Sequence, residues 1–103
     1  MPKEKFKTGA VRDRRKGKGR FDLIPIFAEQ AEAKVWEEGS YTYGDRNFEK
    51  GMPIMRMVDS LKRHINQLVA RQTDADHAAH ARCNTSMIIQ TLAMIELGLL
   101  PKE

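Results

Sequence analysis

The strongest constraint on the fold is a helical pattern of apolar residues in the middle of the chain. Between residues 53 and 72 the apolar side chains recur every three or four positions, at Ile54, Met57, Val58, Leu61, Ile65 and Leu68. Pro53 stands at the start of this segment, where its missing N–H costs nothing, and no further Pro or Gly interrupts it. The pattern therefore predicts an amphipathic helix over residues 53–72.

A first helix is predicted over residues 23–38, in "LIPIFAEQAEAKVWEEG". Asp22 can cap its start, Pro25 fits its first turn, and Gly39 is a natural C-terminal stop. The segment between this helix and Pro53, "SYTYGDRNFEKGMP", is rich in turn residues and is expected to be a long, functional loop.

A third helix is predicted from Thr73 to Gly98. Thr73 is expected as the N-cap, with Asp76 at the third helical position in a capping box. No segment alternates convincingly with period two. The sequence thus predicts an all-α fold with three main helices.

The charge of the chain is concentrated at its N-terminus. Residues 1–20 hold nine Lys/Arg against Glu4 and Asp13, whereas residues 21–103 hold nine Lys/Arg against twelve acids. We expect residues 1–20 to form an irregular basic arm and residues 21–103 to form a single domain. Such an arm is typical of a solvated tail or a nucleic-acid contact, and it could also clamp the phosphates of a small ligand.

The size of the chain favours an oligomer, and its single cysteine fits a reducing compartment. A domain of 103 residues is marginal alone, so an antiparallel pair of long helices is expected to dock on a second copy in a helical bundle. The alternative is that the first helix covers the pair. The single cysteine excludes an internal disulfide, and no apolar run approaches the roughly 18 residues of a membrane span. We expect a cytoplasmic protein that contacts no membrane.

Polar residues share the inward face of the second and third helices. His77 and Asn84 fall on one line with Ala81, Ile88 and Thr91, and His64 lies on the inward face of the second helix. Buried polar groups need partners, which can be each other, water, a metal or a ligand. A lone inward histidine is usually a satisfied core residue, so His64 alone would carry no functional conclusion.

The start of the third helix combines possible metal ligands. Asp74, Asp76, His77, His80 and Asn84 fall within eleven residues. Their oxygen ligands favour Mg²⁺ or Mn²⁺, and the spacing matches no standard zinc motif. The alternative is that both aspartates only cap the helix.

Two other groups of residues have a functional and an ordinary interpretation. In the loop, Arg46, Asn47 and Lys50 flank glycines that allow close approach of a ligand, and a base could stack on the aromatic residues Tyr41, Tyr43 and Phe48. The alternative is an ordinary surface loop. Asp59 and Arg63 have the i, i+4 spacing of a solvated ion pair.

Four segments occur in the order of one known family. They are "TGAVRDRRKGKGRFDLIP", "EEGSYTYGDRNFEKGMP", "DSLKRHINQL" and "DADHAAHARCN". Over Thr8 to Leu97 the chain resembles the dATP/dGTP diphosphohydrolase N-terminal domain family of phages and bacteria. This family is distantly similar to the all-α MazG-like nucleotide pyrophosphatases.

The resemblance implies hydrolysis of purine deoxynucleoside triphosphates to the monophosphate and pyrophosphate. It implies Mg²⁺ or Mn²⁺ as cofactor, a homodimer or homotetramer, and the host cytoplasm if the gene is a phage gene. With the residue chemistry, it suggests catalytic roles for Asp76, His77, His80 and His64. The metal ligands would be Asp74, Asp76 and either Asp59 or a helix-one glutamate, which is Glu29, Glu32 or Glu38. Substrate contacts would come from Arg12, Lys18, Arg20, Tyr43, Arg46, Asn47, Lys50, Arg63 and Asn84.

One departure from the family pattern keeps two alternatives open. The family's usual Asp-Glu-Asp-His is here Asp74-Ala75-Asp76-His77, so one carboxylate is missing. The alternatives to an enzyme are a catalytically silent nucleotide-binding protein and a nucleic-acid-binding helical protein that uses its basic arm.

Overall fold

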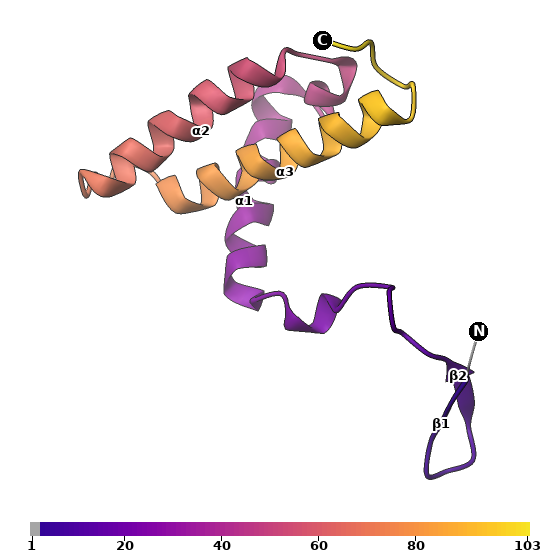
Figure 1. Ribbon diagram of the computed structural model, residues 1–103. Helices are drawn as coiled ribbons and strands as arrows, with labels where there is room; N and C mark the ends of the chain where they lie inside the picture. The colour runs from indigo at the N-terminus through magenta and orange to yellow at the C-terminus, as the bar shows by residue number, and fades with distance from the viewer. Residues whose placement is uncertain (1–2) are drawn as a thin grey trace.

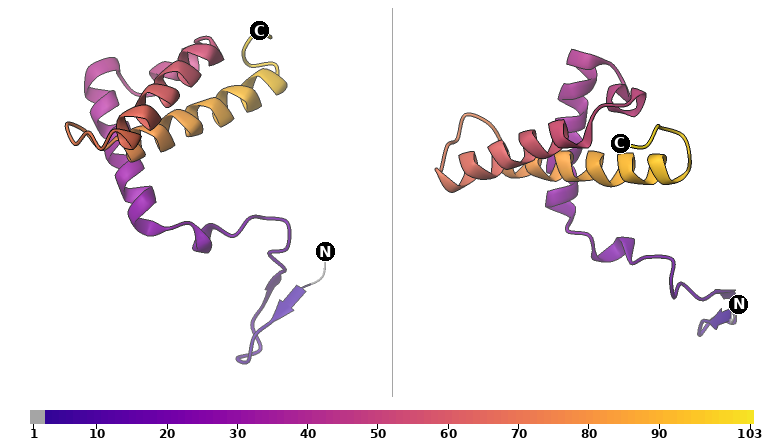
Figure 2. Two further views of the ribbon diagram at one scale, coloured as in Figure 1. Left: turned by 60° about the vertical axis from the view of Figure 1, so that its left-hand side comes forward. Right: turned by 45° about the horizontal axis from the view of Figure 1, so that its top comes forward.

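The computed structural model describes residues 3–103 and is built mainly from three helices. They are α1 (Ile26–Tyr43), α2 (Ile54–Val69) and α3 (His77–Glu96). Helices α2 and α3 lie side by side and antiparallel, and α1 crosses α3 on the far side of this pair (Figures 1 and 2). The predicted mainly helical fold with three helices is confirmed.

Helix α1 begins and ends later than the sequence predicted. Gly39 does not stop it; the helix ends at Gly44, which adopts φ 89° and donates its N–H to the Ser40 carbonyl. The Tyr41 hydroxyl donates to the Glu37 carboxylate at 2.9 Å one turn away, which supports the added turn. The predicted cap Asp22 is also wrong, because Pro25 occupies the N-cap position.

The connection after α1 is shorter than expected because part of it is ordered. A short 3-10 helix, η2 (Asn47–Lys50), fills the middle of the predicted loop. Phe48 from η2 packs against Trp36 of α1, with ring centroids 5.3 Å apart. This contact fixes η2 on α1.

Helix α3 begins at His77, with Asp76 as its N-cap. The Asp76 Oδ1 atom accepts a hydrogen bond from the Ala79 N–H at 3.0 Å. The predicted cap Thr73 and the predicted helical position of Asp76 are therefore wrong. Asp74 lies outside the helix, in the loop between α2 and α3.

The N-terminal arm contains a hairpin that the sequence analysis missed. Strands β1 (Lys3–Lys5) and β2 (Val11–Asp13) pair antiparallel, with Lys3 opposite Asp13 and Glu4 opposite Arg12. Residues of opposite charge thus face each other across the strands, and Gly9 supplies the positive φ of the turn. Figures 1 and 2 show the hairpin standing away from the helices. The prediction of an irregular arm is wrong over these strands.

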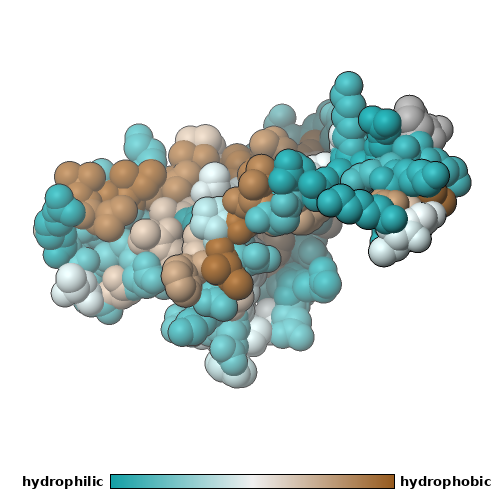
Figure 3. All heavy atoms as spheres, turned by 90° about the horizontal axis from the view of Figure 1, so that it is seen from below, coloured by the Kyte–Doolittle hydropathy of each residue, from teal (hydrophilic) through white to brown (hydrophobic). Residues whose placement is uncertain are grey.

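The core between the helices is small and partly polar. In residues 3–103 the buried apolar side chains are Met57, Ala79 and Cys83, joined by the buried polar residues His77, Asn84 and Thr91. The predicted line of His77, Asn84 and Thr91 on the inward face of α3 is confirmed. Figure 3 shows further apolar side chains at the surface of the helices, whereas the arm is almost wholly hydrophilic. No helix in the described part of the chain is long and apolar enough to span a membrane.

Candidate functional site

A chain of hydrogen bonds joins the loop after α2 to both helices of the pair. The His77 Nε2 atom lies 2.8 Å from Asp74 Oδ1, and the His77 Nδ1 atom lies 3.0 Å from His64 Nδ1. The His77 side chain is almost completely buried, whereas that of Asp74 is 71% exposed. These hydrogen bonds therefore lead from solvent at Asp74 into the seam between α2 and α3.

The charges of these groups indicate which atom donates and which accepts in each hydrogen bond. The hydrogen bond from His77 lowers the pKa of the Asp74 carboxyl, which is therefore an ionised acceptor. Burial lowers the pKa of His64, and the neighbouring His80, Arg63 and His77 lower it further. With neutral rings, His77 donates Nε2–H to Asp74, and its Nδ1 accepts the Nδ1–H of His64. The Nε2 atom of His64 is then an unprotonated base.

His80 stacks on His64, at the end of these hydrogen bonds opposite to Asp74. Its ring lies parallel to that of His64 within 15°, with centroids 4.7 Å apart. The buried Asn84 donates from Nδ2 to the His80 carbonyl at 2.9 Å, which fixes the turn that carries His80. The sequence predicted that these residues would meet, and the structure brings them together.

A cleft of about 500 Å³ lies beside this cluster, between one face of α1 and the start of α3. Glu38 contributes a carboxylate from α1, and Asp74 and Asp76 contribute two more from the other wall. His80 is the imidazole that lines the cleft. The remaining lining residues are Phe27, Gln30, Ala31, Lys34, Val35 and Ala75.

The chemistry of these donors fits a hard divalent cation in part. Carboxylate oxygens are the ligands that Mg²⁺ and Mn²⁺ prefer, and three of the predicted metal ligands, Glu38, Asp74 and Asp76, line this one cleft. Within residues 3–103, however, no three His, Cys, Asp or Glu side chains are already gathered closely enough to hold an ion. To hold a metal ion, Glu38, Asp74 and Asp76 would have to come closer together.

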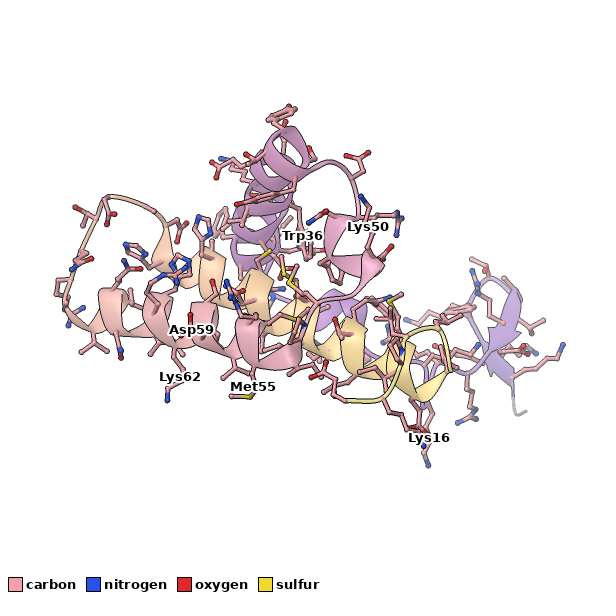
Figure 4. The ribbon with its side chains drawn as sticks, turned by 90° about the horizontal axis from the view of Figure 1, so that it is seen from above. Lys16, Trp36, Lys50, Met55, Asp59 and Lys62 are labelled. Atoms are coloured by element: carbon pink, nitrogen blue, oxygen red, sulfur yellow. The ribbon has the colours of Figure 1, made fainter. Side chains whose placement is uncertain are left out.

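Asp59, which was also predicted as a metal ligand, does not line this cleft. It lines a second cleft of about 630 Å³ along α2 with Lys62 and Arg63, and the two clefts share no lining residue. Its Oδ2 atom lies 3.8 Å from Arg63 Nη1, in an exposed i, i+4 ion pair. Figure 4 shows Asp59 and Lys62 on the side of α2 that faces away from α1.

The helix-one glutamates also occupy different environments. Glu32 accepts hydrogen bonds from Trp36 Nε1 at 2.8 Å, Arg82 Nε at 2.7 Å and Ser86 Oγ at 2.8 Å. Burial alone would raise the pKa of Glu32, but these three donors lower it overall. Glu32 therefore ties α1 to α3, and Glu38 is the helix-one glutamate that lines the cleft.

The sequence matches one family model over most of its length. The model described as "dATP/dGTP diphosphohydrolase, N-terminal" covers residues 8–97. The chain belongs to this family. No curated protein and no solved structure matches it.

In this dATP/dGTP diphosphohydrolase N-terminal domain, the predicted substrate-binding residues do not line the cleft. The lining set contains none of Arg12, Lys18, Arg20, Tyr43, Arg46, Asn47, Lys50, Arg63 and Asn84, as far as residues 3–103 are described. Arg20 instead donates two hydrogen bonds to Asp22, at 2.9 and 2.8 Å. Arg46 adopts φ 57° and pairs with Glu49 at 3.2 Å. Their roles toward a substrate stay predictions.

Sequence reasoning missed three residues of the cleft in this family member. Phe27 was not singled out as a site residue, yet it is among the most exposed large hydrophobic residues, at 82%. Gln30 and Lys34 were not singled out, although they follow Phe27 at i+3 and i+7 and so share its face. The i, i+3, i+7, i+11 spacing of Phe27, Gln30, Lys34 and Glu38 was the available signal.

Proposed function

We propose that this chain hydrolyses dATP or dGTP to the monophosphate and pyrophosphate in the cleft between α1 and the start of α3. The observation that carries the proposal is the meeting of Glu38, Asp74, Asp76 and His80 around one cleft. Membership of the dATP/dGTP diphosphohydrolase N-terminal domain family supports the choice of substrate.

Glu38, Asp74 and Asp76 would hold Mg²⁺ or Mn²⁺. A divalent ion bound there would neutralise the charge of the phosphates and activate a water molecule. Asp76 combines this role with capping of α3: within residues 3–103 its Oδ1 accepts the Ala79 N–H, and no hydrogen bond reaches its Oδ2. Asp59 is a second-choice ligand, because it lines the other cleft.

The histidines would act on water and on the phosphates. The water oxygen bonds to the α-phosphorus, the bond from that phosphorus to the bridging oxygen breaks, and pyrophosphate leaves, while the protons of the water pass to solvent. His80 lines the cleft and orients the water or a phosphate oxygen. His64 stacks on His80, and His77 holds His64 in one tautomer, so these two residues position His80 from behind.

The protein would act as a homodimer or homotetramer. Apolar side chains on the outer faces of α2 and α3 stay exposed in the single chain, among them Met55, Val69, Ile89 and Leu92. Covering them with a second copy would bury apolar area that this small core lacks. Light scattering during gel filtration tests this, since a monomer at micromolar concentration would contradict it.

The basic arm and the loop after α1 would serve the cleft of a neighbouring copy. Arg12, Lys18 and Arg20 lie on an arm that stands away from the helices (Figure 2). In residues 3–103, the lining of the cleft also contains none of Tyr43, Arg46, Asn47 and Lys50. Asn84 would contribute from the seam between α2 and α3, and Arg63 from the exposed face of α2. Across a subunit boundary, the basic groups could meet the triphosphate.

The direct test is incubation of the protein with each deoxynucleoside triphosphate and Mg²⁺ or Mn²⁺. Monophosphate and pyrophosphate should appear with dATP or dGTP, whereas inorganic phosphate alone would contradict the proposal. Mixing Asp76→Asn chains with chains that lack residues 1–20 tests the role of the arm. Recovery of turnover by the mixture is expected, and no recovery would contradict action between copies.

A second candidate function is binding of nucleic acid by the arm. The projecting hairpin and the residues after it carry most of the excess positive charge of the chain, and all of this segment is exposed. Deleting residues 1–20 separates the two functions. Loss of a salt-dependent affinity for DNA or RNA with turnover unchanged would favour nucleic-acid binding. A third possibility, nucleotide binding without turnover because of Ala75, would give binding of dATP but no products.

A further inference from the structure

The cleft beside α3 changes in chemistry along the face of α1. Phe27, Ala31 and Val35 follow one another at i, i+4 and i+8 and make the wall apolar. Glu38 lies eleven residues after Phe27, which corresponds to about 16 Å along a helix that rises 1.5 Å per residue. One wall of the cleft therefore runs from an aromatic ring to a carboxylate over a distance comparable to an extended nucleotide.

Phe27 stands at the apolar end with its ring uncovered. Its side chain is 82% exposed. The ring pairs in the described part of the chain are Trp36 with Phe48, and His64 with His77 and His80, so no ring stacks on Phe27. Leaving an aromatic side chain in water forgoes stabilisation, which a stacked ring would recover.

The other aromatic residues considered for stacking lie elsewhere. Phe48 contacts Trp36, and the Tyr41 hydroxyl is bonded to Glu37. Tyr43 ends α1 beyond Glu38, and as far as residues 3–103 are described it lies outside the lining of the cleft. Phe27 is the residue that brings a benzene ring to the same cleft as the three carboxylates.

We infer that Phe27 is the residue on which the purine base stacks, with Ala31 and Val35 as the apolar floor. This inference rests on the proposed function and adds to it the placement of the nucleotide. The base lies at the start of α1, and the triphosphate extends along the helix toward Glu38, Asp74 and Asp76. Lys34 lies between the two ends, where its ammonium group can meet a phosphate oxygen.

The placement favours purines for a physical reason. Stacking between a base and an aromatic side chain depends on the overlap of their faces, and a purine offers the larger face. Substitution of such a residue by alanine typically weakens binding about 5- to 150-fold. Phosphate groups contribute nothing to this contact, so a ligand without a base should not sense Phe27.

The test compares two ligands on the full chain by calorimetry. One is dATP with a methylene group in place of the α–β bridging oxygen, which cannot be cleaved there, and the other is inorganic triphosphate. Phe27→Ala should weaken the dATP analogue about 5- to 150-fold and leave inorganic triphosphate unchanged. Phe27→Trp should restore the affinity for the analogue.

Phe21→Ala is the matched control, because Phe21 is an equally exposed phenylalanine, at 77%, that is absent from the cleft lining of residues 3–103. It should leave both affinities unchanged. Circular dichroism and light scattering should show the same fold and mass for all variants.

Several results would overturn the inference. They are an unchanged affinity of Phe27→Ala for the analogue, equal weakening of both ligands, or no binding of the analogue to the unmodified protein. A change of mass in Phe27→Ala that Phe27→Trp does not reverse would instead assign Phe27 to a contact between copies. The proposed function is judged separately: binding that depends on Phe27 without release of pyrophosphate would retain the stacking site and refute hydrolysis.

Discussion

The Nδ1 atoms of His64 and His77 lie 3.0 Å apart, so one proton must lie between them. Because the Nε2 atom of His77 is bonded to Asp74, the proton belongs to His64 in the neutral pair. One further proton can be added at His64 Nε2 without loss of this hydrogen bond. A second would place two N–H groups face to face.

Acid should destabilise the seam between α2 and α3, because the charged form of His64 is disfavoured by burial and by the neighbouring His80 and Arg63. The pKa of His64 is lowered in the folded chain, so its stabilising contribution is fully present above about pH 6.5 and is lost as the pH falls through the lowered value. A lowering of the pKa by one unit corresponds to about 1 kcal/mol, which is several degrees of melting temperature for a domain of this size. Thermal melts at pH 8 and pH 5.5 measure the loss.

His64→Gln is the variant that isolates the contribution of this pair. Its melting temperature should change less between pH 8 and pH 5.5 than that of the unmodified protein, because the titrating ring is gone. An equal change in both proteins would show that other groups control the acid response.

Replacing Asp76 by asparagine should separate catalysis from folding. Asparagine caps helices as well as aspartate, so Asp76→Asn should keep the hydrogen bond to Ala79 and melt within a few degrees of the unmodified protein. Turnover should fall on the order of 100-fold or more, because a charge that faces the ion and the phosphates is lost. Pyrophosphate release and thermal melting are the two measurements.

Asp76→Ala provides the comparison for the cap. It should lose turnover and in addition about 1 kcal/mol of stability, because the Ala79 N–H loses its acceptor. Full activity of Asp76→Asn would remove Asp76 from the site.

Removing the charge of Glu32 should loosen the junction of α1 and α3. Glu32→Gln leaves Arg82 without its partner and weakens the bonds from Trp36 and Ser86. We expect a loss of about 1–3 kcal/mol in the free energy of unfolding, measured by urea denaturation. Glu29→Gln is the control, since Glu29 is exposed on the same helix. Equal stability of the two variants would refute the role of Glu32.

The Cys83 thiol should be unreactive in the folded protein. Burial raises its pKa to about 12, so almost no thiolate is present at pH 8. Alkylation by iodoacetamide, followed by mass spectrometry, should be slow in buffer and rapid in urea. Rapid modification of the folded chain would show that the helices open at this point.

The sequence predicted well the features that depend on regular apolar spacing. The helix opened by Pro53 begins where expected, and the line of His77, Asn84 and Thr91 is buried as expected. Helix ends were predicted less well, because Gly39 is tolerated inside α1 and Gly44 supplies the positive φ that ends it. The hairpin was missed because its short strands are exposed and mostly charged, with residues such as Glu4 and Arg12 opposite each other, and so show no apolar alternation.

The cleft was harder to predict, since it depends on how α1 crosses α3. Spacing along α3 placed Asp74, Asp76 and His80 near one another, but nothing in the sequence specified which glutamate of α1 would face them. The crossing is fixed by Glu32 and Arg82, residues fifty positions apart. With this crossing, Glu38 and Phe27 line the cleft, whereas Asp59 lines the other cleft along α2.

The most direct test of the proposed site is the rate of pyrophosphate release by Glu38→Gln and Glu29→Gln, measured side by side with dATP, dGTP and Mg²⁺. Both glutamates are exposed on α1, but in residues 3–103 only Glu38 lines the cleft with Asp74 and Asp76. The cleft predicts a loss on the order of 100-fold or more for Glu38→Gln and a nearly unchanged rate for Glu29→Gln. An unchanged rate for Glu38→Gln would contradict catalysis in this cleft.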